Sequence, residues 1–359
     1  MLPARRVSVT SDTNSAPFRV AFTGDFQDSA GSPKYRDYGL STLQACPQIE
    51  HLVIPQWTAE LTAEQIDNAN GVVVLSSRVT KQSLAGRGEL LAIARFGVGY
   101  DSVDVAACTE ADVLLLIAVG AVDRSVAEAT LTWMLALSHH VRSKDLLVRR
   151  GNWDARSQFM GSELRQRTLG LVGFGRIAKA LIQLVKTFGM KEIVAFDPLV
   201  DRQVAARQGV ELVDLDELLA RADFVSIHCP LNDKTSNLIG ASELAKMKPD
   251  AFLINTARGG IVDEQALYRA LKEGRIAGAG IDVFAAEPLT RPHPLAEFDN
   301  VLLAPHCIAW TNELFGDIGR TVCQGLADLA RGQEPAGMVN PEVLQRPGFK
   351  EKWARWRRS

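Results

Sequence analysis

The sequence predicts an α/β protein with two doubly wound parallel sheets, and three observations lead to that prediction. The chain has 359 residues, which is more than one ordinary hydrophobic core holds, so we expect two domains. Short apolar runs alternate with helix-like segments in two separate blocks, which is typical of mainly parallel sheets covered on both faces. A long helix-like segment, Val122–Arg150, lies between the two blocks.

The first block follows residues 1–17, which we expect to form a flexible arm because they are mostly small and polar. Five apolar runs predict strands at Phe18–Thr23, His51–Ile54, Gly71–Leu75, Leu91–Phe96 and Val113–Ile117. Helices are expected between them at Tyr35–Ala45, Ala63–Asn70 and Val103–Glu110.

The segment Val122–Arg150 predicts a single long helix with one apolar side and a basic end. A helix of this length often connects two domains or packs across an interface between subunits. A long helix inside one core is an equally good interpretation of the sequence.

The second block contains six strand-like runs, which match a complete dinucleotide-binding sheet. The strands are expected at Leu169–Val172, Glu192–Phe196, Phe224–His228, Ala251–Ile254, Ala279–Val283 and Val301–Leu303. The helices are expected at Arg176–Phe188, Val200–Gln208, Asp216–Ala220, Ala241–Met247, Asp263–Lys272 and Gly316–Ala330.

The chain after Ala309 has no partner strands of its own, so we expect it to pack back on the first block. This predicts a discontinuous domain, residues 18–120 plus 310–345, and a continuous nucleotide-binding domain, residues 121–309. Residues 346–359 form a basic segment with two tryptophans. We expect a solvated tail, or one that docks on a partner subunit; a nucleic-acid or membrane patch is the alternative.

Composition and charge exclude several classes of protein. Hydrophobic residues make up 47% and charged residues 23%, as in soluble globular proteins, and the net charge of −2 predicts no nucleic-acid or membrane partner. The five cysteines are scattered without a Cys-x-x-Cys pair, so we expect neither a metal site nor a disulfide framework. Arg5-Arg6 is followed by polar residues and not by the apolar stretch of an export signal. The cytoplasm is therefore the expected location.

A dinucleotide-binding motif follows the first strand of the second block. The segment Leu171–Ala178 reads G-x-G-x-x-A and opens an amphipathic helix, which is the context that makes this motif specific. Gly173 allows a tight turn, Gly175 lets the backbone approach a pyrophosphate, and Ala178 keeps the helix close to the strand. The N–H groups at the helix N-terminus favour an anion there.

Asp197 ends the next strand, where a carboxylate can accept hydrogen bonds from the adenosine ribose. A carboxylate at that place also repels a 2′-phosphate, so NAD is expected in preference to NADP. The alternative is that Asp197 only caps a turn with Pro198.

Three polar residues follow three further predicted strands. Arg258 lies in Asn-Thr-Ala-Arg-Gly-Gly, Glu287 in Asp-Val-Phe-Ala-Ala-Glu-Pro, and His306 in Ala-Pro-His. Ligands of open α/β sheets bind at the carboxyl ends of the strands. An arginine fork suits a carboxylate, and an imidazole can give and take a proton near neutral pH. Each residue alone also fits a structural role, but together and in this order they predict a catalytic set.

The order of these motifs resembles the D-isomer-specific 2-hydroxyacid dehydrogenases, from about Phe18 to Val339. Phe96–Asp101 resembles the substrate-carboxylate loop of that family, and His228–Leu231 resembles its His-x-Pro-Leu segment. The resemblance implies a Rossmann NAD-binding domain and a discontinuous flavodoxin-like substrate domain. It also implies hydride transfer between NAD(H) and a small 2-oxo or D-2-hydroxy acid, such as glyoxylate or hydroxypyruvate, and a homodimer.

The resemblance assigns a role to each residue of the catalytic set. Arg258 binds the carboxylate and carbonyl of the oxo acid, His306 is the general acid, and Glu287 hydrogen-bonds His306 and favours its charged form. The implied substrate contacts are Val98, Gly99, Arg258, His306 and Trp310. The implied cofactor contacts are Gly173, Phe174, Gly175, Arg176, Ile177, Asp197, His228, Cys229, Pro230, Thr235, Thr256, Ala257, Arg258, Asp282 and His306. Asp282 could instead cap a turn.

The chain departs from the family pattern after His306. Ile308 and Trp310 are bulky where the family often has small residues, which predicts an altered or narrowed substrate pocket. Phosphoglycerate is a less favoured substrate because no regulatory domain follows the second block. An NADH-sensing, corepressor-like binding protein is the alternative function. The histidines His51, His139, His140 and His293 are expected to be structural or to lie at the surface.

Overall fold

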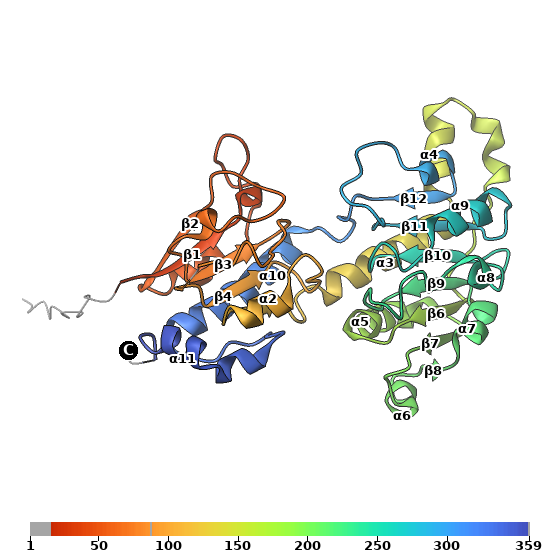
Figure 1. The fold of residues 1–359 in the computed structure, drawn as a ribbon. Coiled ribbons are helices and arrows are strands. Elements are labelled where there is room, and N and C mark those ends of the chain that lie inside the picture. Colours follow the sequence, from red (N-terminus) through yellow and green to blue (C-terminus); the bar gives the residue numbers. More distant parts are fainter. Residues whose placement is uncertain (1–15, 87, 358–359) are drawn as a thin grey trace, which may run out of the picture. The chain divides into compact units, whose positions relative to one another are not determined.

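The computed structural model describes residues 16–86 and 88–357 (Figure 1). Most of the proposed N-terminal arm, residues 1–15, therefore lies outside the described residues. The chain divides into two compact units. The first unit runs to Ala121 and resumes at Phe315, and the second unit is Val122–Leu314.

The first unit is built on a five-stranded parallel sheet. The strands are β1 (Phe18–Phe22), β2 (Ile49–Val53), β3 (Gly71–Val74), β4 (Ala92–Arg95) and β5 (Leu114–Ile117). Their order in the sheet is β2-β1-β3-β4-β5, the flavodoxin-like order, which confirms the predicted fold class. β1 and β3 pair through Val20 and Gly71, which lie opposite each other.

The helices of the first unit are α1 (Leu40–Gln44), α2 (Val105–Glu110), α11 (Pro347–Trp353) and most of α10 (Asn312–Ala330), with 3-10 turns η1 (Gly24–Phe26), η2 (Glu64–Ile66) and η6 (Pro341–Gln345). Of these, α1 and α2 are shorter than the sequence predicts, whereas α10 begins four residues earlier than predicted. The helix predicted at Ala63–Asn70 is wrong, because only η2 forms there. Asn68 adopts a left-handed φ of 64°, and the Asn70 side chain accepts a hydrogen bond from the Arg19 N–H of β1.

The expectation of a solvated or partner-docked C-terminal tail is also wrong. Phe349, Trp353 and Trp356 are at most 4% exposed, and Trp356 meets Phe18 of β1 edge to face at 5.0 Å. The Trp353 Nε1 donates to the Leu329 carbonyl at 2.9 Å. The burial of these aromatic side chains shows that the segment belongs to the core of the first unit. In the sequence, basic residues separate the aromatic residues, so the apolar side of the helix is difficult to recognise.

Replacing Trp353 by alanine is expected to lower the free energy of unfolding of the first unit by about 3–5 kcal/mol. The change removes a fully buried aromatic side chain and one of the two hydrogen bonds to the Leu329 carbonyl, which keeps the bond from the Gly332 N–H. Denaturant unfolding measures the loss. Lys350→Ala on the exposed side of α11 is the control and should change the value by less than about 0.5 kcal/mol. Equal stability of the two variants would contradict this placement of the tail.

The second unit is built on a seven-stranded parallel sheet. The strands are β6 (Thr168–Val172), β7 (Glu192–Phe196), β8 (Glu211–Leu212), β9 (Phe224–Ile227), β10 (Phe252–Asn255), β11 (Gly278–Ile281) and β12 (Val301–Leu303). Their order is β12-β11-β10-β9-β6-β7-β8, the dinucleotide-binding order with one strand added at the end, and the order reverses at β6. The sequence predicts six of these strands and misses β8, which is too short to show a periodic pattern.

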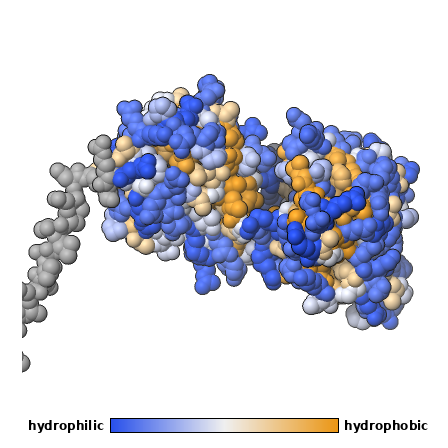
Figure 2. Space-filling model, turned by 90° about the horizontal axis from the view of Figure 1, so that it is seen from below, coloured by the Kyte–Doolittle hydropathy of each residue, from blue (hydrophilic) through white to orange (hydrophobic). Residues whose placement is uncertain are grey.

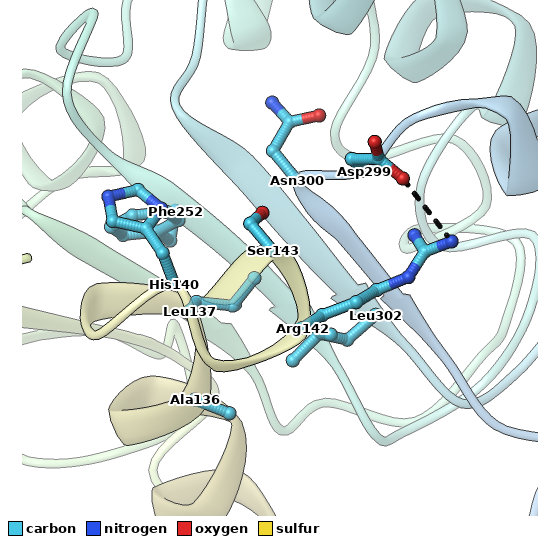
Figure 3. A pocket seen from close by; sticks show the side chains of 9 residues that line it. All are labelled: Ala136, Leu137, His140, Arg142, Ser143, Phe252, Asp299, Asn300 and Leu302. Atoms are coloured by element: carbon cyan, nitrogen blue, oxygen red, sulfur yellow. Dashed lines mark ion pairs between the residues drawn. The ribbon is translucent and has the colours of Figure 1, made fainter. Parts of the chain in front are cut away.

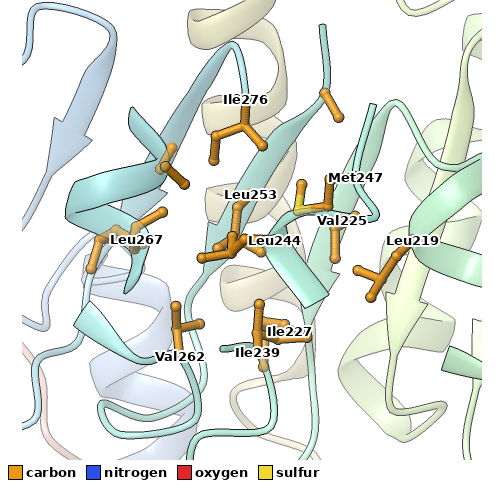
Figure 4. Packing of buried hydrophobic residues seen from close by; sticks show 14 of the residues in the cluster. Leu219, Val225, Ile227, Ile239, Leu244, Met247, Leu253, Val262, Leu267 and Ile276 are labelled. Carbon is orange, nitrogen blue, oxygen red and sulfur yellow. The ribbon is translucent and has the colours of Figure 1, made fainter. Parts of the chain in front are cut away.

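Helices cover both faces of this sheet (Figure 1). They are α3 (Asp123–Ser138), α4 (Val141–Arg149), α5 (Arg176–Val185), α6 (Arg202–Ala206), α7 (Leu215–Arg221), α8 (Ala241–Leu244) and α9 (Glu264–Lys272), with turns η3 (Trp153–Gln158), η4 (Lys186–Phe188) and η5 (Pro294–Glu297). Two apolar clusters fill the space between helices and sheet, one of them shown in Figure 4. In the other, Trp133 of α3 lies so close to Gly280 of β11 that a Cβ there would be 2.6 Å from the indole. These clusters fix the positions of the strand ends.

The prediction of one helix over Val122–Arg150 is wrong, because α3 and α4 are separate. His140 has a left-handed φ of 52°, which ends the first helix and turns the chain. Arg142 then donates to the Phe298 and Val301 carbonyls at 2.8 and 3.1 Å and pairs with Asp299 at 3.6 Å. Figure 3 shows this contact beside a cavity of about 10 Å³, at the edge of the sheet where β12 begins. It is the edge opposite the predicted catalytic residues.

Hydrophilic residues cover most of the visible surface of each unit, and smaller apolar patches lie among these hydrophilic residues (Figure 2). Within residues 16–86 and 88–357, we find no helix with the length and hydrophobicity that a membrane span requires.

Candidate active site

The three residues of the predicted catalytic set follow three adjacent strands of the second unit. Arg258 lies after β10, Glu287 after β11 and His306 after β12, and these strands are neighbours in the sheet. All are parallel, so their carboxyl ends meet at one edge.

Glu287 and His306 form a direct pair. The Nδ1 atom of His306 lies 2.8 Å from Oε2 of Glu287, and Oε1 accepts a hydrogen bond from the Phe284 N–H, also at 2.8 Å. A carboxylate on Nδ1 assigns the proton to that nitrogen in the neutral ring. Nε2 is then the nitrogen that can exchange a proton with a reactant.

The environment of Glu287 favours its ionised form. Burial raises the pKa of this carboxyl, but the hydrogen bonds from His306 and Phe284 and the charges of His306 and Arg258 lower it by more. The net pKa of Glu287 lies below its ordinary value. The carboxylate therefore stays charged at neutral pH and can stabilise an imidazolium at His306.

Asp282 holds the turn that carries His306. Its Oδ1 accepts the N–H groups of Cys307 and Ile308 at 2.8 and 3.2 Å, and its carbonyl accepts the His306 N–H at 2.7 Å. His306 has a left-handed φ of 54°, so the turn needs this support. Burial raises the pKa of Asp282 to about 6. The turn-capping role is thus present in the structure, and the nicotinamide contact stays a prediction.

The Arg258 loop is shaped by a residue that the sequence analysis did not single out. Asn255, which is 2% exposed, donates to the Arg258 carbonyl at 2.9 Å and accepts the Ala257 N–H at 3.0 Å. Gly259 then touches the next loop, since a Cβ there would lie 1.9 Å from the Phe284 carbonyl oxygen. The loops that carry Arg258 and Glu287 therefore support each other. Asn255 opens the Asn-Thr-Ala-Arg-Gly-Gly motif, and that was the only signal in the sequence.

The glycine-rich loop has the geometry expected for a pyrophosphate. Gly173 has a φ of 100°, and a Cβ there would lie 2.7 Å from the carbonyl carbon of His228. A Cβ at Gly175 would meet nothing within 4 Å, and α5 begins at the next residue. The loop thus leaves space at a helix N-terminus for an anion. Phe174 is 1% exposed and packs in the core, so only its backbone can face a nucleotide.

Asp197 accepts two backbone N–H groups, from Phe174 at 2.9 Å and from Leu199 at 2.9 Å. The turn-capping alternative is therefore present in the structure. A carboxylate has about four acceptor positions, so these bonds leave capacity for ribose hydroxyls. Arg176, beside the loop, pairs with Asp123 of α3 at 2.7 Å, and Ile177 is half-buried.

The segment after β9 is fixed by its own side chains. The His228 Nε2 lies 2.8 Å from the Ser226 hydroxyl, and burial lowers the pKa of His228 to about 4, so this ring is neutral at pH 7. Burial raises the pKa of Cys229 to about 11, so it is a thiol. Thr235 donates to the Pro230 carbonyl at 2.6 Å. A ring with this lowered pKa is not suited to donate a proton at neutral pH.

The two bulky residues after His306 have different surroundings. Ile308 is partly buried and packs against the apolar cluster of α3 and α5. Trp310 is 50% exposed, and its backbone N–H donates to the Cys307 carbonyl at 2.9 Å. Trp310 is therefore the bulky side chain at the surface of this turn.

Val98 and Gly99 belong to the first unit, just beyond β4. Gly97 before them has a φ of 140°, and its carbonyl accepts the Ala118 N–H at 2.8 Å. Both residues are partly exposed in a bend.

Residues 131–307 match the family model described as D-isomer specific 2-hydroxyacid dehydrogenase, NAD binding domain. A glyoxylate reductase of Korarchaeum cryptofilum is 35% identical over 323 residues, which cover 87% of this chain and 96% of that protein. A D-3-phosphoglycerate dehydrogenase of Methanocaldococcus jannaschii is 41% identical over 80% of this chain, but this chain spans only 55% of its length. The chain therefore belongs to the D-isomer specific 2-hydroxyacid dehydrogenase family, and the cofactor of its second unit is NAD.

A solved structure agrees with this assignment. D-lactate dehydrogenase from Aquifex aeolicus, crystallised with NAD and lactic acid, has a TM-score of 0.75 and 26% identity, and the match covers 87% of this chain and 96% of that one. The corepressor-like alternative finds no support in these comparisons.

Proposed function

We propose that this protein transfers a hydride between NAD(H) and a small 2-oxo or D-2-hydroxy acid of the glyoxylate or hydroxypyruvate type. The Glu287–His306 contact at 2.8 Å is the observation that carries this proposal. It joins the loops that follow β11 and β12, and β11 lies next to β10, which leads to Arg258. Reduction of a carbonyl next to a carboxylate requires a proton donor and a group that binds the anion, and the imidazole of His306 and the guanidinium of Arg258 can supply them.

Each residue of the set does one task in this proposal. Arg258 binds the carboxylate and the carbonyl oxygen of the oxo acid through its planar fork. His306 donates the proton on Nε2 to the carbonyl oxygen, and it takes that proton back in the oxidative direction. Glu287 stabilises the imidazolium. The bound nicotinamide supplies the hydride.

Cofactor and substrate contacts from the family pattern remain part of the proposal. The backbone of Gly173–Ile177 holds the pyrophosphate, Asp197 holds the adenosine ribose, and Thr256, Ala257 and Asp282 lie on the nicotinamide side. Val98 and Gly99 bind the substrate carboxylate with their N–H groups, and Trp310 contacts the rest of the substrate.

The substrate is tested by NADH oxidation with glyoxylate, hydroxypyruvate, pyruvate and 3-phosphohydroxypyruvate. The relatives carry both names, glyoxylate reductase and D-3-phosphoglycerate dehydrogenase, so the panel must separate them. We expect the highest kcat/KM with glyoxylate or hydroxypyruvate. A higher value with the phosphorylated acid would replace the proposed substrate, and NADH binding without turnover of any acid would contradict the reaction.

Replacing Glu287 by glutamine is expected to move the alkaline limb of the reductive rate profile to lower pH by about one unit or more. Wild-type Glu287 has a lowered pKa, so its charge supports the protonated ring over the whole neutral range and is lost only as the pH falls through that pKa. The kcat profile between pH 5 and 10 measures the shift. Glu297→Gln, whose carboxylate bonds only the Tyr268 hydroxyl among the described contacts, is the control. An unchanged profile in Glu287→Gln would exclude this role.

A homodimer is a further part of the proposal. Residues 141–160, which contain α4 and η3, expose four apolar side chains that are each more than half exposed: Val141, Val148, Trp153 and Met160. Exposure of these apolar side chains to water is unfavourable in a monomer, and a second copy of the chain would cover them. Light scattering should give twice the mass of the chain, and Val148→Glu with Met160→Glu should give a monomer.

A further inference from the structure

We propose that Glu264, in the first turn of α9, is a positioning residue that keeps Glu287 at hydrogen-bond distance from His306. The inference rests on the proposed function, because it concerns the same pair of residues. It assigns a task in the reaction to a residue that never touches the substrate.

The segment that carries Glu287 has little packing of its own. Phe284 is 6% exposed and anchors the beginning of the segment in the apolar cluster. From Ala285 to Pro292 every residue is exposed. A solvated loop moves unless polar contacts hold it, yet the Glu287–His306 contact needs a fixed carboxylate.

Glu264 supplies such a contact from a rigid helix. Its Oε1 accepts the Ala285 N–H at 2.6 Å. α9 is fixed at this end because Asp263 caps it, accepting the N–H groups of Gln265 and Ala266 at 2.9 and 3.0 Å. Leu267, one turn on, is fully buried. The carboxylate of Glu264 is therefore a fixed point against which the loop is held.

The second oxygen of Glu264 holds the far end of the same loop. His293 is mostly buried, and its Nε2 lies 3.1 Å from Oε2 of Glu264. The Leu295 N–H points at Nδ1 of His293 at 3.3 Å, which makes Nδ1 an acceptor. The ring proton is then on Nε2 and is donated to Glu264. One carboxylate thus binds the loop before Glu287, at Ala285, and after it, at His293.

Only a few covalent bonds separate the Ala285 N–H, which Glu264 accepts, from the Phe284 N–H, which Glu287 accepts. The Ala285 N–H and the Phe284 carbonyl belong to one planar peptide group, and the Phe284 N–H is the donor to Oε1 of Glu287. Gly259 of the Arg258 loop lies so close to the same Phe284 carbonyl that no Cβ would fit between them. Loss of the Glu264 contact would release this peptide group, and a misplacement of about 1 Å at a reacting group can cost on the order of a hundredfold in rate.

The test compares Glu264→Ala and Glu264→Gln with Glu273→Ala, a change at the opposite end of α9 where Glu273 pairs with exposed Arg275. In Glu264→Ala we expect kcat for 2-oxo acid reduction to fall roughly tenfold or more. The dissociation constant of NADH should stay within about twofold, because the described hydrogen bonds of Glu264 go to Ala285 and His293 and none goes to the glycine-rich loop. Glu264→Gln keeps an acceptor oxygen for the Ala285 N–H and should recover part of the rate. Glu273→Ala should match the wild type.

A double-mutant cycle separates positioning from a general loss of stability. If Glu264 acts through Glu287, then adding Glu264→Ala to Glu287→Gln should lower kcat by less than about twofold further. Full additivity, an unchanged kcat in Glu264→Ala, or a fall in kcat that follows the fraction of unfolded protein would each overturn the inference. A wild type that oxidises no NADH with any 2-oxo acid would refute the proposed function itself, which is a different result.

Discussion

His306→Ala is expected to lower kcat for 2-oxo acid reduction by roughly a thousandfold, within the range of about 10²–10⁴ that general acid catalysis contributes. The substitution removes the imidazole that follows β12 and is paired with Glu287. This imidazole is the proposed proton donor. NADH should still bind, because the glycine-rich loop and Asp197, which hold the pyrophosphate and the adenosine ribose in the proposal, are not changed. Stopped-flow or steady-state absorbance measures the rate, and quenching of tryptophan fluorescence measures NADH binding.

The matched control is His139→Ala, an exposed histidine after α3 that should keep the wild-type rate. His306→Gln tests the proton transfer itself, since an amide keeps a polar group in the turn but does not ionise near neutral pH. Activity of His306→Gln within about threefold of the wild type would show that the imidazole is not the acid.

Arg258→Lys is expected to lower kcat/KM for the oxo acid by roughly a hundredfold, and Arg258→Ala by more. The lysine keeps the charge but has no planar fork, so it cannot bind a carboxylate and a carbonyl oxygen together. KM for the oxo acid should rise and kcat should fall, because the carbonyl contact strengthens as charge develops on the oxygen. Steady-state kinetics with a saturating concentration of NADH separates the two effects.

Arg269→Lys provides the control for this pair, since Arg269 lies at the exposed side of α9. A full rate in Arg258→Lys would mean that a point charge is enough and that the bidentate contact is absent. Loss of NADH binding in Arg258→Lys would instead point to a role in the cofactor site alone.

The positions of the three proposed catalytic residues follow from local rules in the sequence. Arg258, Glu287 and His306 each come directly after an apolar run, and parallel strands bring their ends to one edge. The structure places them on neighbouring strands and joins Glu287 to His306. Their roles in the reaction remain predictions until they are measured.

What the sequence does not predict depends on contacts between distant segments. The aromatic face of Phe349, Trp353 and Trp356 is hidden among basic residues, and only packing against β1 identifies it as core. The break between α3 and α4 depends on the left-handed His140 and on the Arg142 contacts with the β12 segment. A helix-forming pattern continues across it, so the sequence alone favours one helix.

The support of the catalytic pair was missed for the same reason. In the sequence Asp282 fits both a cofactor contact and a turn cap, and its bonds to the N–H groups of Cys307 and Ile308 appear only in three dimensions. Glu264 and His293 are separated in the chain and meet through the fold. No spacing rule in the sequence links either of them to Glu287.

The most direct test of the central claim is the fate of the hydride. Hydroxypyruvate is reduced with NADH that carries deuterium at both C4 positions, and the product is analysed for chirality and for deuterium at C2. The account predicts D-glycerate with one deuteron at C2, formed by the wild type and lost together with NADH oxidation in His306→Ala. An L product, a product without deuterium at C2, or NADH binding with no reduction of any 2-oxo acid would contradict it.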